Sequence, residues 1–174
     1  GMVAMHYAAR HPGGISKLIL SSTAAQFRLD ETMKMMRKLG GARAADVARE
    51  FFSNPSKVAY DTYGQVCLPL YSNPNVPAAG AFRDRAIERP EVAFHFFSDE
   101  MAHMDMRAEI ANITCPTLVI GGAIDPVTPP ICSEAIADAI GDNARLQVLE
   151  GCGHGPHRDN PKGAEKIMRH FLAD

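Results

Sequence analysis

The amino-acid sequence predicts an α/β fold of about three parallel strands with flanking helices, into which a helical cap is inserted. Three short apolar runs stand beside helix-like segments, and such continuous runs are typical of strands buried on both faces of a parallel sheet. A long stretch with helical spacing separates the first run from the second. We therefore expect a core from residues 1–28 and 114–174, and a cap or lid from residues 29–113.

The first α/β unit begins the chain. Residues 2–10 form a candidate helix, which a proline followed by two glycines ends. Residues 15–22 then read as a strand, because their central leucine-isoleucine-leucine run is apolar without alternation.

Two further units end the chain. One pairs a strand at residues 117–122 with a helix at about residues 130–140. The other has a strand at residues 145–149, a loop, and a helix at residues 161–172. Asn160 precedes that last helix and can cap its first turn.

The insertion between these units is predicted to be helical. The expected helices cover residues 30–39, 44–52, 56–68, 91–104 and 105–113. A proline-rich loop with Pro69, Pro74 and Pro77 separates the third helix from the fourth.

The insertion also contains many methionines and phenylalanines, whose adaptable apolar side chains suit a pocket that closes over an apolar substrate. Packing within the cap or against the sheet is the simpler explanation for any single one of them. They are Met33, Met35, Met36, Met101, Met104, Met106, Phe51, Phe52, Phe94, Phe96 and Phe97.

Composition narrows the classes of function. The net charge of -2 and pI near 6.4 provide no basic surface, so we expect no nucleic-acid partner and no membrane association. The first residues lack the basic region and cleavage site of a signal peptide, so we expect a cytoplasmic location. The four cysteines form no Cys-x-x-Cys pair, which favours reduced thiols over a disulfide framework or metal site.

Asp125 and His154 are the candidate catalytic residues. Each follows a predicted strand, and the carboxyl ends of parallel strands are where open α/β sheets bind ligands. A carboxylate there can accept the Nδ1 proton of a histidine and orient the ring as a general base. The alternative is that Asp125, which precedes Pro126, only initiates a turn, and that His154 is an incidental loop residue.

The segments around this pair resemble those of a known superfamily. Residues 113–126 resemble the acid-bearing strand of α/β-hydrolases, and residues 151–156 with Asn160-Pro161 are similar to their histidine loop. Residues 1–12 look like the helix that follows the nucleophile in that superfamily. Among capped members, the chain is most similar to the prolyl-iminopeptidase-like group. The resemblance implies a Ser-His-Asp triad, of which Asp125 and His154 would be two members.

The third member of that triad is missing. No G-x-S-x-G occurs in the chain. The resemblance would put the nucleophile about three residues before Gly1, and the first half of the sheet would then also be missing from the chain. Ser21 and Ser22 end a strand but lack the glycines that expose a nucleophile, and Cys152 is expected to pack beneath the histidine loop. His154 and His157 lack accompanying ligands, so we expect neither a metal nor a cofactor.

The resemblance also suggests a substrate. In the iminopeptidase-like group, carboxylates of the cap hold the free amine of the substrate. The acids in a suitable segment here are Glu88, Glu91, Asp99 and Glu100, and ordinary surface charges would look the same, so none is assigned.

Two hypotheses follow. The chain is the carboxyl-terminal part of a serine hydrolase that acts on a small ester, amide or peptide, and is inactive alone because the nucleophile is absent. The alternative is a non-catalytic binding or assembly module. Because the strand at residues 15–22 would lose one neighbour, we expect its open edge to form a homodimer or to pair with a missing partner segment.

Overall fold

The computed structural model describes residues 1–76, 87 and 89–174. Its sheet has three parallel strands in the order β1 (Leu18–Ser21), β2 (Thr117–Gly122) and β3 (Ala144–Leu149). The central strand β2 is buried along its whole length, which agrees with its unbroken apolar sequence. The prediction of a partial, parallel α/β sheet is therefore confirmed.

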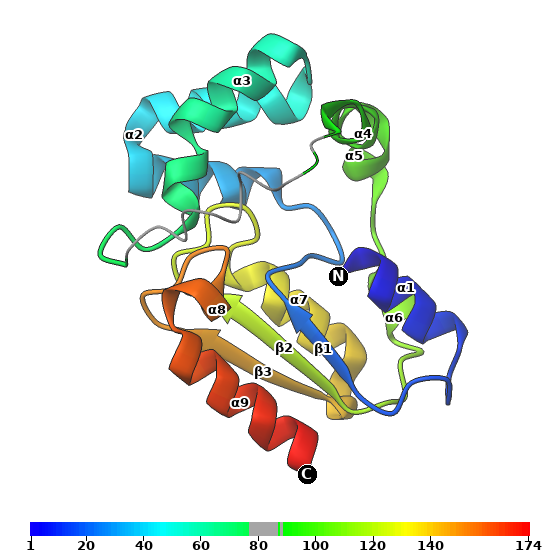
Figure 1. Cartoon of the computed structure of the whole chain (residues 1–174). Coiled ribbons are helices and arrows are strands. Elements are labelled where there is room, and N and C mark those ends of the chain that lie inside the picture. Colours follow the sequence, from blue (N-terminus) through cyan, green and yellow to red (C-terminus); the bar gives the residue numbers. More distant parts are fainter. Residues whose placement is uncertain (77–86, 88) are drawn as a thin grey trace.

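Helices cover both faces of the sheet (Figure 1). On one face, α1 (Met2–Arg10) and α7 (Pro130–Ile140) bury Met5 and Ile136 in one apolar cluster with Val119 of β2. On the other face, α9 (Pro161–Ala173) packs Phe171 against the neighbours of Val119 on β2. Adjacent residues of β2 thus pack into different clusters, as expected for a strand buried on both faces.

The segment between β1 and β2, which we call the cap, begins with α2 (Leu29–Ser53). The sequence predicts two helices here, and α2 consists of two helical halves that meet at a kink at Gly41, whose φ of 75° is accessible to glycine without strain. Next come α3 (Lys57–Val66), whose cap Ser56 accepts the amide of Ala59, and the short η1 (Leu68–Tyr71).

The second part of the cap is irregular. The predicted helix over residues 91–104 is divided into α4 (Pro90–His95), the π-helical η3 (Phe96–Glu100) and α5 (Met101–His103). The predicted helix over residues 105–113 is only one turn, α6 (Arg107–Ile110), and its Ile110 packs in the cluster of α1 and α7. Pro77 and Glu88 lie outside the described residues.

The cap has an apolar cluster of its own. Met36, Phe51, Phe52 and Tyr63 are buried there, and the aromatic rings contact one another edge to face or tilted. Figure 1 shows α2 and α3 standing over the carboxyl ends of the strands, with the short helix α8 (Pro156–Asp159) beneath them. Within the described ranges, no helix is long and apolar enough to cross a membrane.

Candidate active site

Asp125 lies in the loop after β2, and its side chain is fully buried. Its Oδ1 accepts hydrogen bonds from the main-chain N–H groups of Val127 at 2.8 Å and Thr128 at 2.9 Å. Its Oδ2 accepts a third bond from the Thr128 hydroxyl at 2.9 Å. A buried carboxyl group needs such donors, and the loop after β2 supplies three of them to Asp125.

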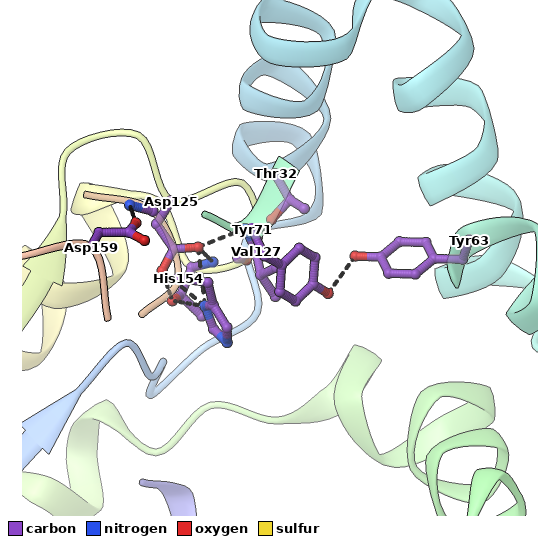
Figure 2. Close-up of polar contacts among 9 residues, drawn as sticks. Thr32, Tyr63, Tyr71, Asp125, Val127, His154 and Asp159 are labelled. Carbon is purple, nitrogen blue, oxygen red and sulfur yellow. Dashed lines mark hydrogen bonds and ion pairs between the residues drawn. The ribbon is translucent and has the colours of Figure 1, made fainter. Parts of the chain in front are cut away.

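His154 lies in the loop between β3 and α8 and faces Asp125 (Figure 2). Its Nδ1 is 2.9 Å from Oδ2 and 3.1 Å from Oδ1 of the carboxylate. An Nδ1–H that donates to Asp125 leaves Nε2 with its lone pair in the neutral ring. With 27% of its side chain exposed, the ring is accessible while its partner is not. The structure therefore brings the two candidate residues together with the geometry of an oriented base.

Thr128 is a member of this network that the sequence analysis missed. Besides its two bonds to Asp125, its hydroxyl lies 3.5 Å from Nδ1 of His154. A threonine three residues after an aspartate is a known turn pattern, and that spacing is the signal that points to it.

The histidine loop approaches its neighbours so closely that glycine is required. A Cβ added to Gly122 would lie 2.1 Å from the carbonyl oxygen of Gly153. A Cβ on Gly153 would lie 2.3 Å from the carbonyl oxygen of Tyr71 in the cap. The absence of these side chains lets β2, the histidine loop and the cap meet as bare backbone.

The structure also places the other nucleophile candidates, and Ser22 lines the same cavity as His154. Cys152 is buried beneath the loop with Leu118 and Phe171, and burial raises the pKa of its thiol. Ser22 has a strained φ of 46°, and its hydroxyl has no hydrogen-bond partner among the residues that the structure describes. His157 is exposed on α8, and no metal-ligating group of three or more His, Cys, Asp or Glu occurs in residues 1–76, 87 and 89–174.

A cavity of about 880 Å³ lies between the cap and the strand ends, and His154 and Thr128 form part of its wall. The cap contributes an aromatic lining, which consists of Phe51, Phe52, Tyr60, Tyr63, Tyr71, Phe96 and Phe97. Four of the five phenylalanines considered from the sequence thus reach the cavity, whereas Phe94 packs on the cap cluster.

The methionines of the insertion divide between different sites. Met101 and Met104 line the cavity, Met33 and Met36 fill the cap cluster, and Met106 packs against the core. The sequence could not separate these roles because all of them use the same apolar side chain at helical spacing.

Charged groups are scarce in the cavity wall. Within the described part of the chain, Asp61 is the one carboxylate that lines it, and Lys57 pairs with Asp61 at 2.7 Å. Glu91, Asp99 and Glu100 do not line the cavity, and Asp99 pairs with His103 at 3.3 Å. Glu88 lies outside the described residues.

Two tyrosine hydroxyls provide polarity inside this aromatic wall. Tyr63 and Tyr71 are joined by a hydrogen bond of 2.7 Å between their hydroxyl oxygens (Figure 2). Burial, followed by the neighbouring Tyr71, raises the pKa of Tyr63 far above its ordinary value, so its phenol stays neutral. A neutral hydroxyl pair can exchange hydrogen bonds with an uncharged polar group without adding a charge to the cavity.

Comparison with known proteins agrees with this fold. The profile of the family described as "Serine aminopeptidase, S33" matches residues 1–161. Strigolactone esterase D14 of Arabidopsis thaliana is 25% identical over 173 residues, which cover 98% of this chain and 62% of that protein. Proline iminopeptidase PfmaB of Pestalotiopsis fici is 26% identical over 180 residues, with coverages of 98% and 63%. Human monoacylglycerol lipase ABHD6 is 25% identical over 185 residues, with coverages of 99% and 52%.

The chain thus spans less than two thirds of the length of these relatives. Among solved structures, proline iminopeptidase from Mycobacterium smegmatis matches with a TM-score of 0.73 and 21% identity, over 99% of this chain and 61% of that one. MenH from S. aureus matches with a TM-score of 0.66 and 20% identity, over 99% and 64%. These structures show a shared fold. The chain therefore belongs to the serine aminopeptidase S33 family, within the α/β-hydrolase superfamily.

Proposed function

We propose that this chain supplies the acid and the base of a serine hydrolase that cleaves an ester or amide bond. The observation that carries the proposal is the pairing of buried Asp125 with Nδ1 of His154 at 2.9 and 3.1 Å. In this mechanism Nε2 of His154 takes the proton of a serine hydroxyl as the serine oxygen attacks the substrate carbonyl. Asp125 stabilises the imidazolium, which then gives the proton to the leaving group.

The serine of this mechanism is proposed to come from a polypeptide segment other than these 174 residues. The sequence contains no G-x-S-x-G, and the curated relatives are longer than this chain. The unpartnered Ser22 hydroxyl lies at the end of β1 without flanking glycines. The chain alone is therefore proposed to be inactive.

For the substrate, we propose an uncharged group with a large apolar or aromatic part. The aromatic wall of the cavity and the hydrogen-bonded hydroxyls of Tyr63 and Tyr71 support this choice. The names of the relatives include an esterase, a lipase and an iminopeptidase, so the scissile bond can be an ester or an amide.

Iminopeptidase-like cleavage of a peptide with a free amine is the finer alternative. It is supported by the likeness to proline iminopeptidase PfmaB, and it requires a carboxylate to bind the amine. Asp61 is the described cavity residue that qualifies, and a substrate amine would have to replace Lys57 as its partner.

A non-catalytic binding or assembly module is the second candidate function. The missing nucleophile motif favours it, and the cavity would then bind an apolar ligand without cleaving it. As partners we propose a second copy of the chain or a complementary segment, paired with the edge of β1 that faces away from β2. A cytoplasmic location is proposed because all four cysteines are free thiols.

The hydrolase proposal is tested with a longer chain, which is expressed from the same reading frame together with the codons that precede Met2. We expect an in-frame G-x-S-x-G there, and hydrolysis of 4-nitrophenyl esters by the longer chain. His154→Ala and Asp125→Asn should reduce kcat by about 10³-fold or more. His157→Ala, three residues along on exposed α8, is the control that should retain activity. Ester hydrolysis that survives His154→Ala would contradict the proposal.

A further inference from the structure

The histidine loop is tied to the cap by hydrogen bonds on both sides of His154. The main-chain N–H of His154 donates to the carbonyl oxygen of Tyr71 at 2.7 Å. Two residues along the cap, the amide nitrogen Nδ2 of Asn73 donates to the carbonyl oxygen of Gly151 at 2.7 Å. Three residues of the cap thus hold four residues of the loop in a fixed register.

Asp159, at the end of α8, also links the histidine loop to the cap. Its Oδ2 accepts the N–H of Gly153 at 2.7 Å and the N–H of Asn73 at 3.1 Å. One carboxylate oxygen therefore binds the residue before His154 and the cap segment at once, as Figure 2 shows for Asp159 beside the loop. A carboxylate oxygen is a strong hydrogen-bond acceptor, so this contact adds a third link between loop and cap.

The other oxygen of Asp159 is enclosed. Oδ1 is buried and has no hydrogen-bond partner among the described residues. The described hydrogen bonds of this carboxylate therefore all go through Oδ2, to the loop and to the cap.

The contact between Gly153 and Tyr71 leaves no room for a side chain at position 153. Gly153 packs its Cα against the Tyr71 carbonyl so closely that a Cβ would lie 2.3 Å from the oxygen. The ring of Tyr71 then stands edge-on to the imidazole, with 5.2 Å between the ring centroids. The position of the His154 ring therefore depends on where the cap segment lies.

We propose that Asp159 is a positioning residue that couples the cap to His154. Its carboxylate holds the loop against residues 71–73 of the cap, and this keeps Nδ1 of His154 directed at Asp125. The catalytic meaning of this coupling rests on the proposed function. The coupling itself is a property of this chain, and it can be measured without any hydrolysis.

The test is heteronuclear NMR of the nitrogen-labelled 174-residue chain in four versions: wild type, Asp159→Ala, Asp159→Asn and Asn73→Ala. Asp142→Ala removes an exposed acid from the turn after α7 and serves as the control. The signals are the Nδ1 proton of His154 and the exchange rates of the Gly153 and His154 amides. Amides of β2 report on global stability.

In Asp159→Ala, the Gly153 and His154 amides should exchange at least about tenfold faster, and the Nδ1 proton signal should broaden or vanish. The β2 amides should stay within about twofold of wild type. Asn73→Ala should act in the same direction on Gly153 and His154. Asp159→Asn keeps an acceptor oxygen without the charge, so its effect should be intermediate, and Asp142→Ala should change nothing.

An unchanged Nδ1 proton signal in Asp159→Ala would overturn the proposal. So would a rise in exchange that is equal in β2 and in the loop, because Asp159 would then only stabilise the whole fold. If Asp159→Ala does not fold, the same signals in Asp159→Asn decide. Failure of the hydrolase proposal would appear as a longer chain without esterase activity, which leaves these signals unaffected.

Discussion

Tyr71 contacts His154 twice, through its carbonyl oxygen at 2.7 Å from the His154 amide nitrogen and through its ring at 5.2 Å between centroids. The cap therefore touches the proposed base directly, and a substrate enclosed by the cap would lie against the imidazole. Since Tyr71 also bonds Tyr63, the contact extends from the histidine loop into the aromatic wall of the cavity.

Thr128 should stabilise the charged form of Asp125. Thr128→Val removes the hydroxyl that donates to Oδ2 at 2.9 Å while it keeps the volume of the side chain. We expect a loss of about 1–3 kcal/mol in the free energy of unfolding, because the buried carboxylate loses a donor. Urea unfolding measures this loss. Thr128→Ser retains the hydroxyl and should recover most of the stability, and equal losses in both variants would contradict the assigned role.

The cavity should bind uncharged aromatic groups. The chain has no tryptophan, so Phe97→Trp places a single fluorophore in the cavity wall. We expect 2-naphthyl acetate to change the fluorescence emission of this tryptophan in a saturable way. Prolyl-2-naphthylamide, which carries a free amine, should bind more weakly. Leu172→Trp on the exposed side of α9 is the matched control and should not respond. Tighter binding of the amine would favour the iminopeptidase alternative.

Asp105 should stabilise the junction between cap and core in a pH-dependent way. It receives two bonds from the Arg107 guanidinium and forms a bridge with Gln26. The Arg107 bonds lower the pKa of Asp105 from 3.8 to about 2. Because the folded-state pKa is lowered, the stabilisation is complete above pH 3.8 and is lost as the pH falls toward 2.

Unfolding of wild type and Asp105→Asn at several pH values checks this dependence. The difference in stability should be small, since the pair is exposed, and should be constant from neutral pH down to about 5. It should disappear near the lower pKa. A difference that grows as the pH falls would contradict the assignment, and Asp142→Asn on an exposed turn provides the control.

The edge of β1 should support association. β1 pairs with β2 on one side, and no strand among residues 1–76, 87 and 89–174 pairs with its other side. We expect sedimentation velocity at micromolar concentration to show a dimer or a larger species. A monodisperse monomer would contradict this expectation.

Much of the fold follows from local sequence signals, because burial on both faces leaves an unbroken apolar run such as the one in β2. The pairing of Asp125 with His154 was predictable for a similar reason, since each follows a strand of one parallel sheet. The break within α2 at Gly41 was predictable as well, because a glycine pair readily ends a helix. Asp159 was missed, because its partners Asn73 and Gly153 are brought to it only by the docking of the cap.

We propose that Asp125 and His154 form the proton-transfer half of a serine hydrolase whose nucleophile lies outside these 174 residues. Labelling of the chain with a fluorophosphonate probe, followed by peptide mass spectrometry, tests it most directly. We expect no labelled serine, Ser22 included. A serine that is labelled in the wild-type chain and loses the label in His154→Ala would contradict it.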